Sequence, residues 1–105
     1  MKKPTDFTKL MTSYLGSYLP LQRNVSQNTI SSYCDAFRLL LTFLRDEKAV
    51  SIERVRLQDF SPKLIREYLS WLGHDRHCGI STRNQRLAAL RAFFKYVEVE
   101  SPQHM

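Results

Sequence analysis

The 105-residue sequence has little of what membrane-bound and disulfide-stabilised proteins need. No apolar run approaches the ~20 residues that cross a bilayer. The N-terminus from Met1 to Thr5 lacks the hydrophobic stretch of a secretory signal. The chain has two cysteines, Cys34 and Cys78, which are too few for a disulfide framework. These absences predict a cytoplasmic protein whose cysteines are free thiols.

The sequence also lacks the patterns on which common enzyme sites are built. It has no glycine-rich phosphate loop, no nucleophile elbow and no His-Glu-x-x-His zinc motif. Its acids are scattered and mostly near bases, which gives no support for a carboxylate pair in acid–base catalysis. His74, His77 and Cys78 have metal-binding side chains, but no second close pair accompanies them, which disfavours a zinc site. We therefore expect no catalytic site, no metal and no cofactor.

What the chain does contain is typical of one small soluble domain. Hydrophobic residues make up 43% of it and charged residues 25%, so it holds enough apolar material for a single core. A core of this size leaves little room for an elaborate catalytic cavity. We expect residues 1–105 to form one domain.

The charge of the chain is uneven, and one segment has no acid at all. The formal net charge is +6, while residues 24–75 hold seven bases and seven acids and contribute nothing to it. Residues 76–97 hold bases only, and Glu98 and Glu100 follow them. The bases of this segment are Arg76, Arg83, Arg86, Arg91 and Lys95. Such a concentration of positive charge points to a polyanionic partner.

Hydrophobic periodicity predicts four α-helices and no β-strand, so the expected fold class is all-α. The predicted ranges are 6–18, 27–48, 62–73 and 82–97. Pro20 is expected to end the first of these helices, and Gly73 together with the polar run 74–79 is expected to end the third. Amphipathic helices in this number predict a compact bundle with polar ends.

The starts of the last three helices have recognisable capping residues. Ser26, Ser61 and Ser81 precede the predicted helices and are expected to be their N-caps. Pro62 follows Ser61 and suits the first helical position, where its missing N–H costs nothing.

The predicted fourth helix has an outer side that suits a DNA major groove. Its apolar stripe consists of Leu87, Leu90, Phe93, Phe94 and Val97. Opposite that stripe, the helical wheel places Ser81, Thr82, Gln85, Ala88, Ala89, Ala92 and Tyr96, with Arg91 and Lys95 on one edge and Arg83 and Arg86 on the other. The alanines permit close approach to DNA, and Gln85 suits a hydrogen bond to the edge of a DNA base. The flanking arginine and lysine side chains suit phosphates. Alanine and arginine are also good helix formers, so a plain solvated surface is the alternative.

The start of the second predicted helix has a comparable outer side. Asn28, Ser31, Ser32 and Asp35 face away from its apolar stripe. Small polar residues suit contacts to a groove or to a DNA backbone, although a plain polar surface is their more common role.

Three segments of the chain follow a recognisable order and spacing. They are Ser26-Gln-Asn-Thr29-Ile-x-x-Tyr33-x-x-x-Phe37, Phe60-Ser-Pro-x-x-Ile65-x-x-Tyr68-Leu and Ile80-Ser-Thr-x-Asn84-x-Arg86-Leu-Ala-Ala-Leu-Arg91-x-Phe-Phe-x-Tyr96. Together they resemble the N-terminal SAM-like, core-binding domain of tyrosine recombinases, the phage and transposon integrases. The resemblance covers nearly the whole chain.

The resemblance implies a four- to five-helix bundle that clamps one face of a recombination site. A separate C-terminal domain clamps the other face in this family. The helices that correspond to the second and fourth ones here lie against the major groove of double-stranded DNA. The implied contact positions are Thr29, Ser31 and Ser32 on the second helix and Ser81, Thr82, Gln85 and Ala89 on the fourth. With Arg83, Arg86, Arg91 and Lys95, they form the expected DNA-binding set.

The catalytic residues of the family lie in the C-terminal domain and include a His-x-x-Arg motif and a tyrosine nucleophile. This chain has no His-x-x-Arg motif, so we expect a non-catalytic DNA-binding fragment of a bacterial or phage recombinase, without the catalytic domain. The resemblance also implies a monomeric isolated domain and a parent protein that is tetrameric on paired DNA sites. A helical SAM-type protein–protein interaction module is the alternative, and its binding would be insensitive to salt.

Overall fold

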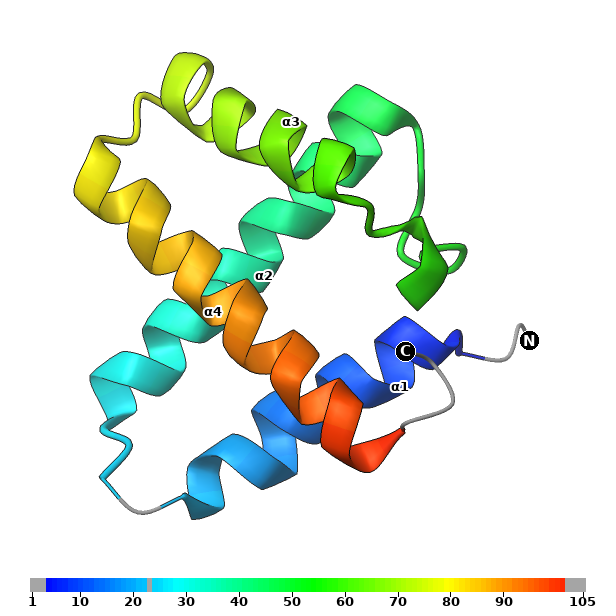
Figure 1. The fold of residues 1–105 in the computed structure, drawn as a ribbon, viewed down its shortest axis with the longest axis vertical. Coiled ribbons are helices and arrows are strands. Elements are labelled where there is room, and N and C mark those ends of the chain that lie inside the picture. The colour runs from blue at the N-terminus through cyan, green and yellow to red at the C-terminus, as the bar shows by residue number, and fades with distance from the viewer. Residues whose placement is uncertain (1–3, 23, 102–105) are drawn as a thin grey trace.

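Four α-helices dominate residues 4–22 and 24–101, the part of the chain described by the structure, which is a computed structural model. They are α1 (Asp6–Ser13), α2 (Gln27–Lys48), α3 (Pro62–His74) and α4 (Ile80–Glu100). Figure 1 shows α4 crossing in front of α2, with α3 on one side of the crossing and α1 on the other. No β-strand occurs within these residues, and the all-α prediction is confirmed.

Two of the predicted helix starts are confirmed by their capping hydrogen bonds. The Ser26 hydroxyl accepts from the backbone N–H of Thr29 at 3.1 Å. The Ser61 hydroxyl accepts from the backbone N–H of Leu64, also at 3.1 Å. Each bond satisfies an N–H group that the first helical turn leaves free. Pro62 begins α3 and has no N–H to satisfy.

The fourth helix is longer at both ends than the predicted range of 82–97. It begins at Ile80, because the backbone N–H of Arg83 already donates to the carbonyl of Gly79 at 3.0 Å. Ser81 therefore lies inside the first turn, and the prediction that it caps the helix is wrong. At the other end, α4 continues to Glu100.

The first helical segment changes its winding partway along. α1 is followed by a π-helical turn (Tyr14–Tyr18), in which the backbone N–H of Leu19 donates to the carbonyl of Tyr14. A 3₁₀ turn (Leu19–Leu21) then contains Pro20, and the chain becomes extended at Gln22. The single helix predicted over 6–18 is thus an α-helix and a wider turn, with Pro20 near the end of the helical path.

Phe93 of α4 is the centre of the hydrophobic core. Its side chain is fully buried. Its ring centroid lies 5.7 Å from that of Phe7 on α1, 5.5 Å from that of Tyr14 and 5.2 Å from that of Phe37 on α2. All three contacts are edge-to-face, the arrangement that aromatic quadrupoles favour. A single side chain therefore ties α4 to both α1 and α2.

Tyr68 joins α3 to α2 by a buried hydrogen bond. Its hydroxyl donates to the backbone carbonyl of Ala36 at 3.1 Å, and both residues are fully buried. Burial disfavours the charged phenolate and so raises the pKa of Tyr68 far above its ordinary value. Burial also raises the pKa of Tyr14 to about 12, with smaller contributions from nearby Tyr33 and Tyr18.

The raised pKa values predict that the fold loses stability in alkali. An unfolded tyrosine releases its proton near pH 10, whereas the raised pKa of Tyr14 in the folded state is about 12. The stabilising contribution is therefore complete below about pH 10 and is lost as the pH rises toward 12. We expect the free energy of unfolding, measured by urea denaturation across a pH series, to fall steadily above about pH 10.

Two phenylalanine variants separate this alkaline effect from the loss of a hydrogen bond. Tyr14→Phe keeps the aromatic ring and is expected to reduce the alkaline loss of stability. Tyr68→Phe is expected to do the same and also to cost about 1 kcal/mol at neutral pH, because the Ala36 carbonyl loses its donor. Alkaline profiles identical to that of the unmodified chain in both variants would contradict this account.

Candidate nucleic-acid interface

The open side of α4 carries two positive charges, at Arg91 and Lys95, and no negative charge up to that point. Its exposed side chains up to Lys95 are Ile80, Ser81, Asn84, Gln85, Ala88, Arg91 and Lys95. None of them is acidic, and neither Arg91 nor Lys95 forms an ion pair with another described residue. Glu98 and Glu100 lie beyond Lys95, at the far end of the helix. The exposed strip therefore combines small and hydrogen-bonding side chains with unpaired positive charge.

The buried side of α4 differs from the predicted one. On a helical wheel of 100° per residue, the centre of the buried residues lies roughly 60° from the centre of the predicted apolar stripe. The wheel places Ala89 and Tyr96 on the outer side, but they are 1% and 9% exposed. The Tyr96 ring packs against Tyr14 and Tyr18, with centroids 5.0 and 4.7 Å away, and its hydroxyl forms a 3.1 Å hydrogen bond with Ser13. Ala89 belongs to the buried side of α4. Ala89 is thus inaccessible, which corrects its place in the DNA-binding set.

Arg83 and Arg86 turn into the bundle, so the predicted second basic margin is not open. A terminal nitrogen of Arg86 donates to the Ser32 carbonyl at 3.2 Å and to the Ser32 hydroxyl at 3.4 Å. Arg83 lies over Gly73 of α3, where an added Cβ would lie 3.0 Å from a guanidinium nitrogen. Gly73 leaves room for this side chain in the last turn of α3, and the helix ends at His74, within the stretch predicted to end it. The Nε atoms of both arginines are buried without a hydrogen-bond partner among the described residues.

A surface hollow lies between α2 and α4 and collects several of the predicted site residues. Its volume is about 380 Å³, and its lining residues are Asn28, Thr29, Ser32, Tyr33, Gln85 and Ala88. We call it the α2–α4 hollow. It brings Thr29, Ser32 and Gln85 of the predicted set together, while Ser31, Ser81 and the half-buried Thr82 are not among its lining residues.

Four residues of this region lie outside the predicted DNA-binding set. Asn28 and Ala88 line the hollow, and both were available as outer-side residues in the helical patterns. Asn84 is exposed on the strip of α4 beside Gln85. Tyr33 also lines the hollow, but it occupies the apolar stripe of α2, so no local signal separates it from a core residue.

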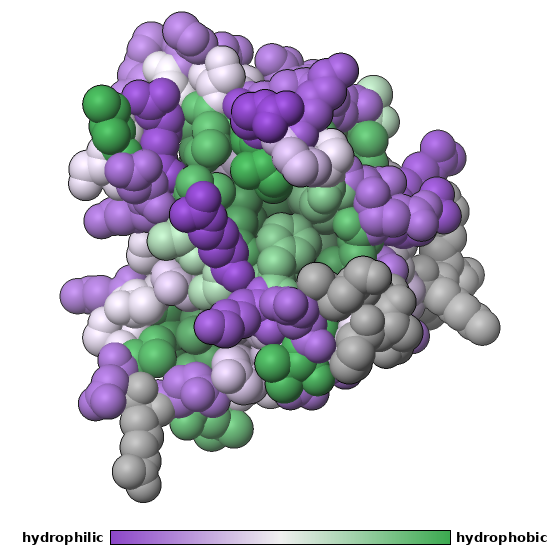
Figure 2. Space-filling view, viewed as in Figure 1, coloured by the Kyte–Doolittle hydropathy of each residue, from purple (hydrophilic) through white to green (hydrophobic). Residues whose placement is uncertain are grey.

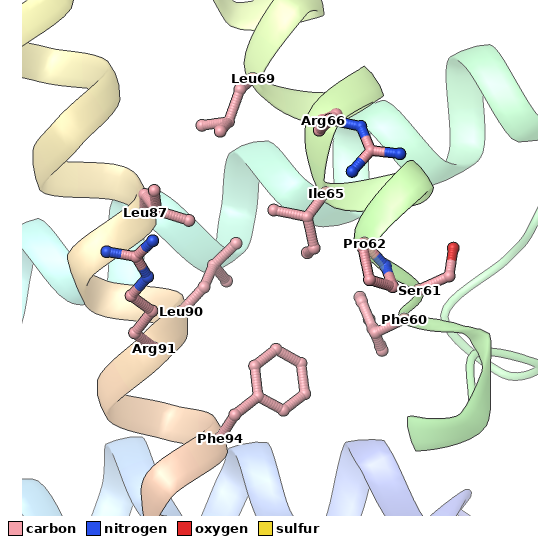
Figure 3. Close-up of a pocket in the computed structure, with 10 residues that line it drawn as sticks. All are labelled: Phe60, Ser61, Pro62, Ile65, Arg66, Leu69, Leu87, Leu90, Arg91 and Phe94. Atoms are coloured by element: carbon pink, nitrogen blue, oxygen red, sulfur yellow. The ribbon is translucent and has the colours of Figure 1, made fainter.

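A second hollow, between α3 and α4, has a different character. Its volume is about 430 Å³, and its lining residues are Phe60, Ser61, Pro62, Ile65, Arg66, Leu69, Leu87, Leu90, Arg91 and Phe94. Figure 3 shows Arg66 and Arg91 on opposite sides of it, and Figure 2 shows hydrophobic surface gathered over this region. Because its walls are mostly apolar, this groove suits a polyanion less well than the exposed strip of α4 does.

Comparisons with known proteins give a consistent result. The family model for the phage integrase, N-terminal SAM-like domain matches residues 13–101. The chain is 34% identical over 104 residues to the putative integrase/recombinase y4rC of Sinorhizobium fredii, which covers 99% of this chain and 31% of that protein. It is 37% identical over 93 residues to the putative integrase/recombinase y4rD of the same organism, covering 89% and 33%. It is 30% identical over 97 residues to tyrosine recombinase XerC of Bacillus subtilis, covering 92% and 29%.

The chain spans about a third of the length of these relatives. No match to a solved structure reaches significance. Within residues 4–22 and 24–101, no helix combines the length and the hydrophobicity needed to cross a membrane.

The bonded Arg86 and the exposed Arg91 are expected to differ in how much they contribute to stability. Arg86→Ala removes the hydrogen bonds that join α4 to Ser32 of α2. We expect the free energy of unfolding to fall by about 1–2 kcal/mol, because a charged donor that bridges two helices is lost. Arg91→Ala serves as the control, since Arg91 is exposed and unpaired, and is expected to change stability by no more than about 0.5 kcal/mol. Urea denaturation of both variants measures the difference, and equal losses would contradict the bracing role of Arg86.

Proposed function

The chain belongs to the phage integrase N-terminal SAM-like domain family, and from this membership we propose that it binds double-stranded DNA. In this proposal it clamps the recombination core site of a site-specific tyrosine recombinase. The observation that carries the proposal is the exposed strip of α4, where Arg91 and Lys95 have no ion-pair partner among the described residues. Basic side chains without an ion-pair partner, on a helix with small neighbouring residues, suit a contact with the major groove.

The geometry suggests a division of work among the side chains. Arg91 and Lys95 contact phosphates, which positions the helix without selecting a sequence. Ala88 is exposed and small, so α4 approaches the groove closely at that point. Ser81, Thr82 and Gln85 of α4, together with Thr29 and Ser31 of α2, supply hydrogen-bonding groups for base edges and the sugar–phosphate backbone.

Arg86 has a supporting part in this interface. Its guanidinium is already bonded to the Ser32 carbonyl and hydroxyl, so we assign it to holding α2 against α4 and not to a phosphate. Arg83, which lies over Gly73, is assigned in the same way to the contact between α3 and α4. Two basic side chains of α4, Arg91 and Lys95, are therefore exposed to a ligand. The other two, Arg83 and Arg86, hold the helix in position.

DNA cleavage is assigned to a separate catalytic domain. The relatives named integrase/recombinase and tyrosine recombinase are about three times as long as the matched region, and residues 1–105 contain no His-x-x-Arg motif. We propose that residues 1–105 form one core-binding domain, which is monomeric on its own. The parent protein is tetrameric on paired DNA sites. It is a cytoplasmic protein of a bacterium, a phage or a mobile element.

DNA binding by this surface predicts a strong dependence on salt. If Arg91 and Lys95 each neutralise one phosphate, log K is expected to fall with log salt concentration at a slope of about −1.8. Lys95→Ala removes one phosphate contact and is expected to reduce the magnitude of the slope by about 0.9. The measurement is an electrophoretic shift of an inverted-repeat duplex by the chain at several salt concentrations.

The matched control for Lys95→Ala is Lys63→Ala. Lys63 is also an exposed lysine, but it lies in the first turn of α3 beside Lys48 and Glu67, at a separate hollow. Its replacement is expected to leave the slope unchanged. No shift of any duplex at low salt would contradict DNA binding, and association that is insensitive to salt would favour a SAM-type protein–protein module instead.

A further inference from the structure

The α2–α4 hollow differs from the rest of the candidate interface because none of its lining residues is charged. Arg91 and Lys95, the open bases of α4, are not among them. Arg86 reaches the wall of the hollow, but it donates to Ser32 and so braces the wall. The hollow therefore suits a neutral group, whereas Arg91 and Lys95 outside it suit phosphates.

Two of the lining side chains are amides. Asn28 on α2 and Gln85 on α4 are both exposed, so both are free to turn toward a ligand. A side-chain amide matches the N6 and N7 atoms of adenine with one donor and one acceptor. Guanine is preferred by arginine or lysine and cytosine by a carboxylate, and neither kind of group lines the hollow.

Two of the three hydroxyl groups that line the hollow, those of Thr29 and Ser32, already have a hydrogen-bond partner within the protein. The Thr29 hydroxyl forms a 3.1 Å hydrogen bond with Ser26, and the Ser32 hydroxyl lies 3.4 Å from a donating nitrogen of Arg86. The remaining surface is supplied by the Ala88 methyl, the Thr29 methyl and the half-buried ring of Tyr33. Apolar groups of this kind suit the C5-methyl group of thymine, which projects into the major groove.

We propose, on the premise of the proposed DNA-binding function, that the α2–α4 hollow recognises one A·T base pair in the major groove. The Gln85 amide bonds the N6 and N7 edge of adenine, with Asn28 as the second amide within the hollow. The thymine methyl group packs on Ala88 and Thr29 against the ring of Tyr33. A volume of about 380 Å³ admits the edge of a base pair, because it far exceeds the share of about 30 Å³ that one water takes in the liquid.

The test begins with selection of bound duplexes from a randomised library by the 105-residue chain at low salt. We expect the selected duplexes to share at least one position that is A·T. Replacing that pair by G·C is expected to weaken binding by about 5- to 150-fold. Replacing its adenine by 7-deazaadenine, which lacks N7, and separately its thymine by uracil, which lacks the methyl group, are each expected to weaken binding at that position only.

Two neighbouring amides of α4 provide the matched pair of variants. Gln85→Ala removes one of the two amides within the hollow and is expected to reduce the preference for A·T over G·C at the selected position. Asn84→Ala removes an exposed amide that does not line the hollow, and it is expected to keep the preference. Both side chains are exposed on the same helix, so both variants are expected to keep the fold, which thermal denaturation checks.

The outcomes separate this inference from the function on which it rests. Binding with equal affinity for A·T and G·C at every position overturns the hollow as a recognition site but leaves DNA binding intact. A preference that Gln85→Ala leaves unchanged, or that 7-deazaadenine leaves unchanged, also overturns it, and equal binding of the uracil-containing duplex overturns the thymine contact. Failure to bind any duplex at low salt overturns the DNA-binding function itself.

Discussion

The packing of Phe93 is the constraint on which the rest of the structure depends. This one fully buried ring meets Phe7, Tyr14 and Phe37 in edge-to-face contacts, so it fixes α4 against α1 and α2 at once. Because an α-helix is rigid, holding one residue inward sets the direction of every other side chain along it. The buried side of α4 determines which of its bases reach solvent, and therefore which surface is available to a ligand.

The basic residues of α4 fall into two groups with different surroundings. Arg86 bonds Ser32 of α2 and Arg83 lies over Gly73 of α3, whereas Arg91 and Lys95 remain exposed. The inner arginines keep buried Nε atoms that lack partners among the described residues, which is a cost to the fold. In return, these two arginines fix the position of α4 in the bundle. Without that fixed position, the α2–α4 hollow would have no defined width.

Much of the fold follows from the sequence, but the site follows only in part. The capping residues Ser26 and Ser61 were predicted correctly because a cap depends on the next three residues alone. The outward position of Ala89 was predicted wrongly, because the helical wheel assumes one core direction and α4 packs against three helices. Tyr33 was missed because a half-buried ring at the edge of a hollow has the same periodicity as a core residue.

The sequence by itself determined the number and type of the helices, the acid-free charge of the segment 76–97, and the pattern that marks the family. These properties are local or additive, so each can be recognised from neighbouring residues. Only the tertiary structure decided the rotation of α4 and the joining of Asn28 with Gln85 in one hollow. The physical reason is that the angle at which two helices cross depends on side chains far apart in the chain, whose contacts no local period records.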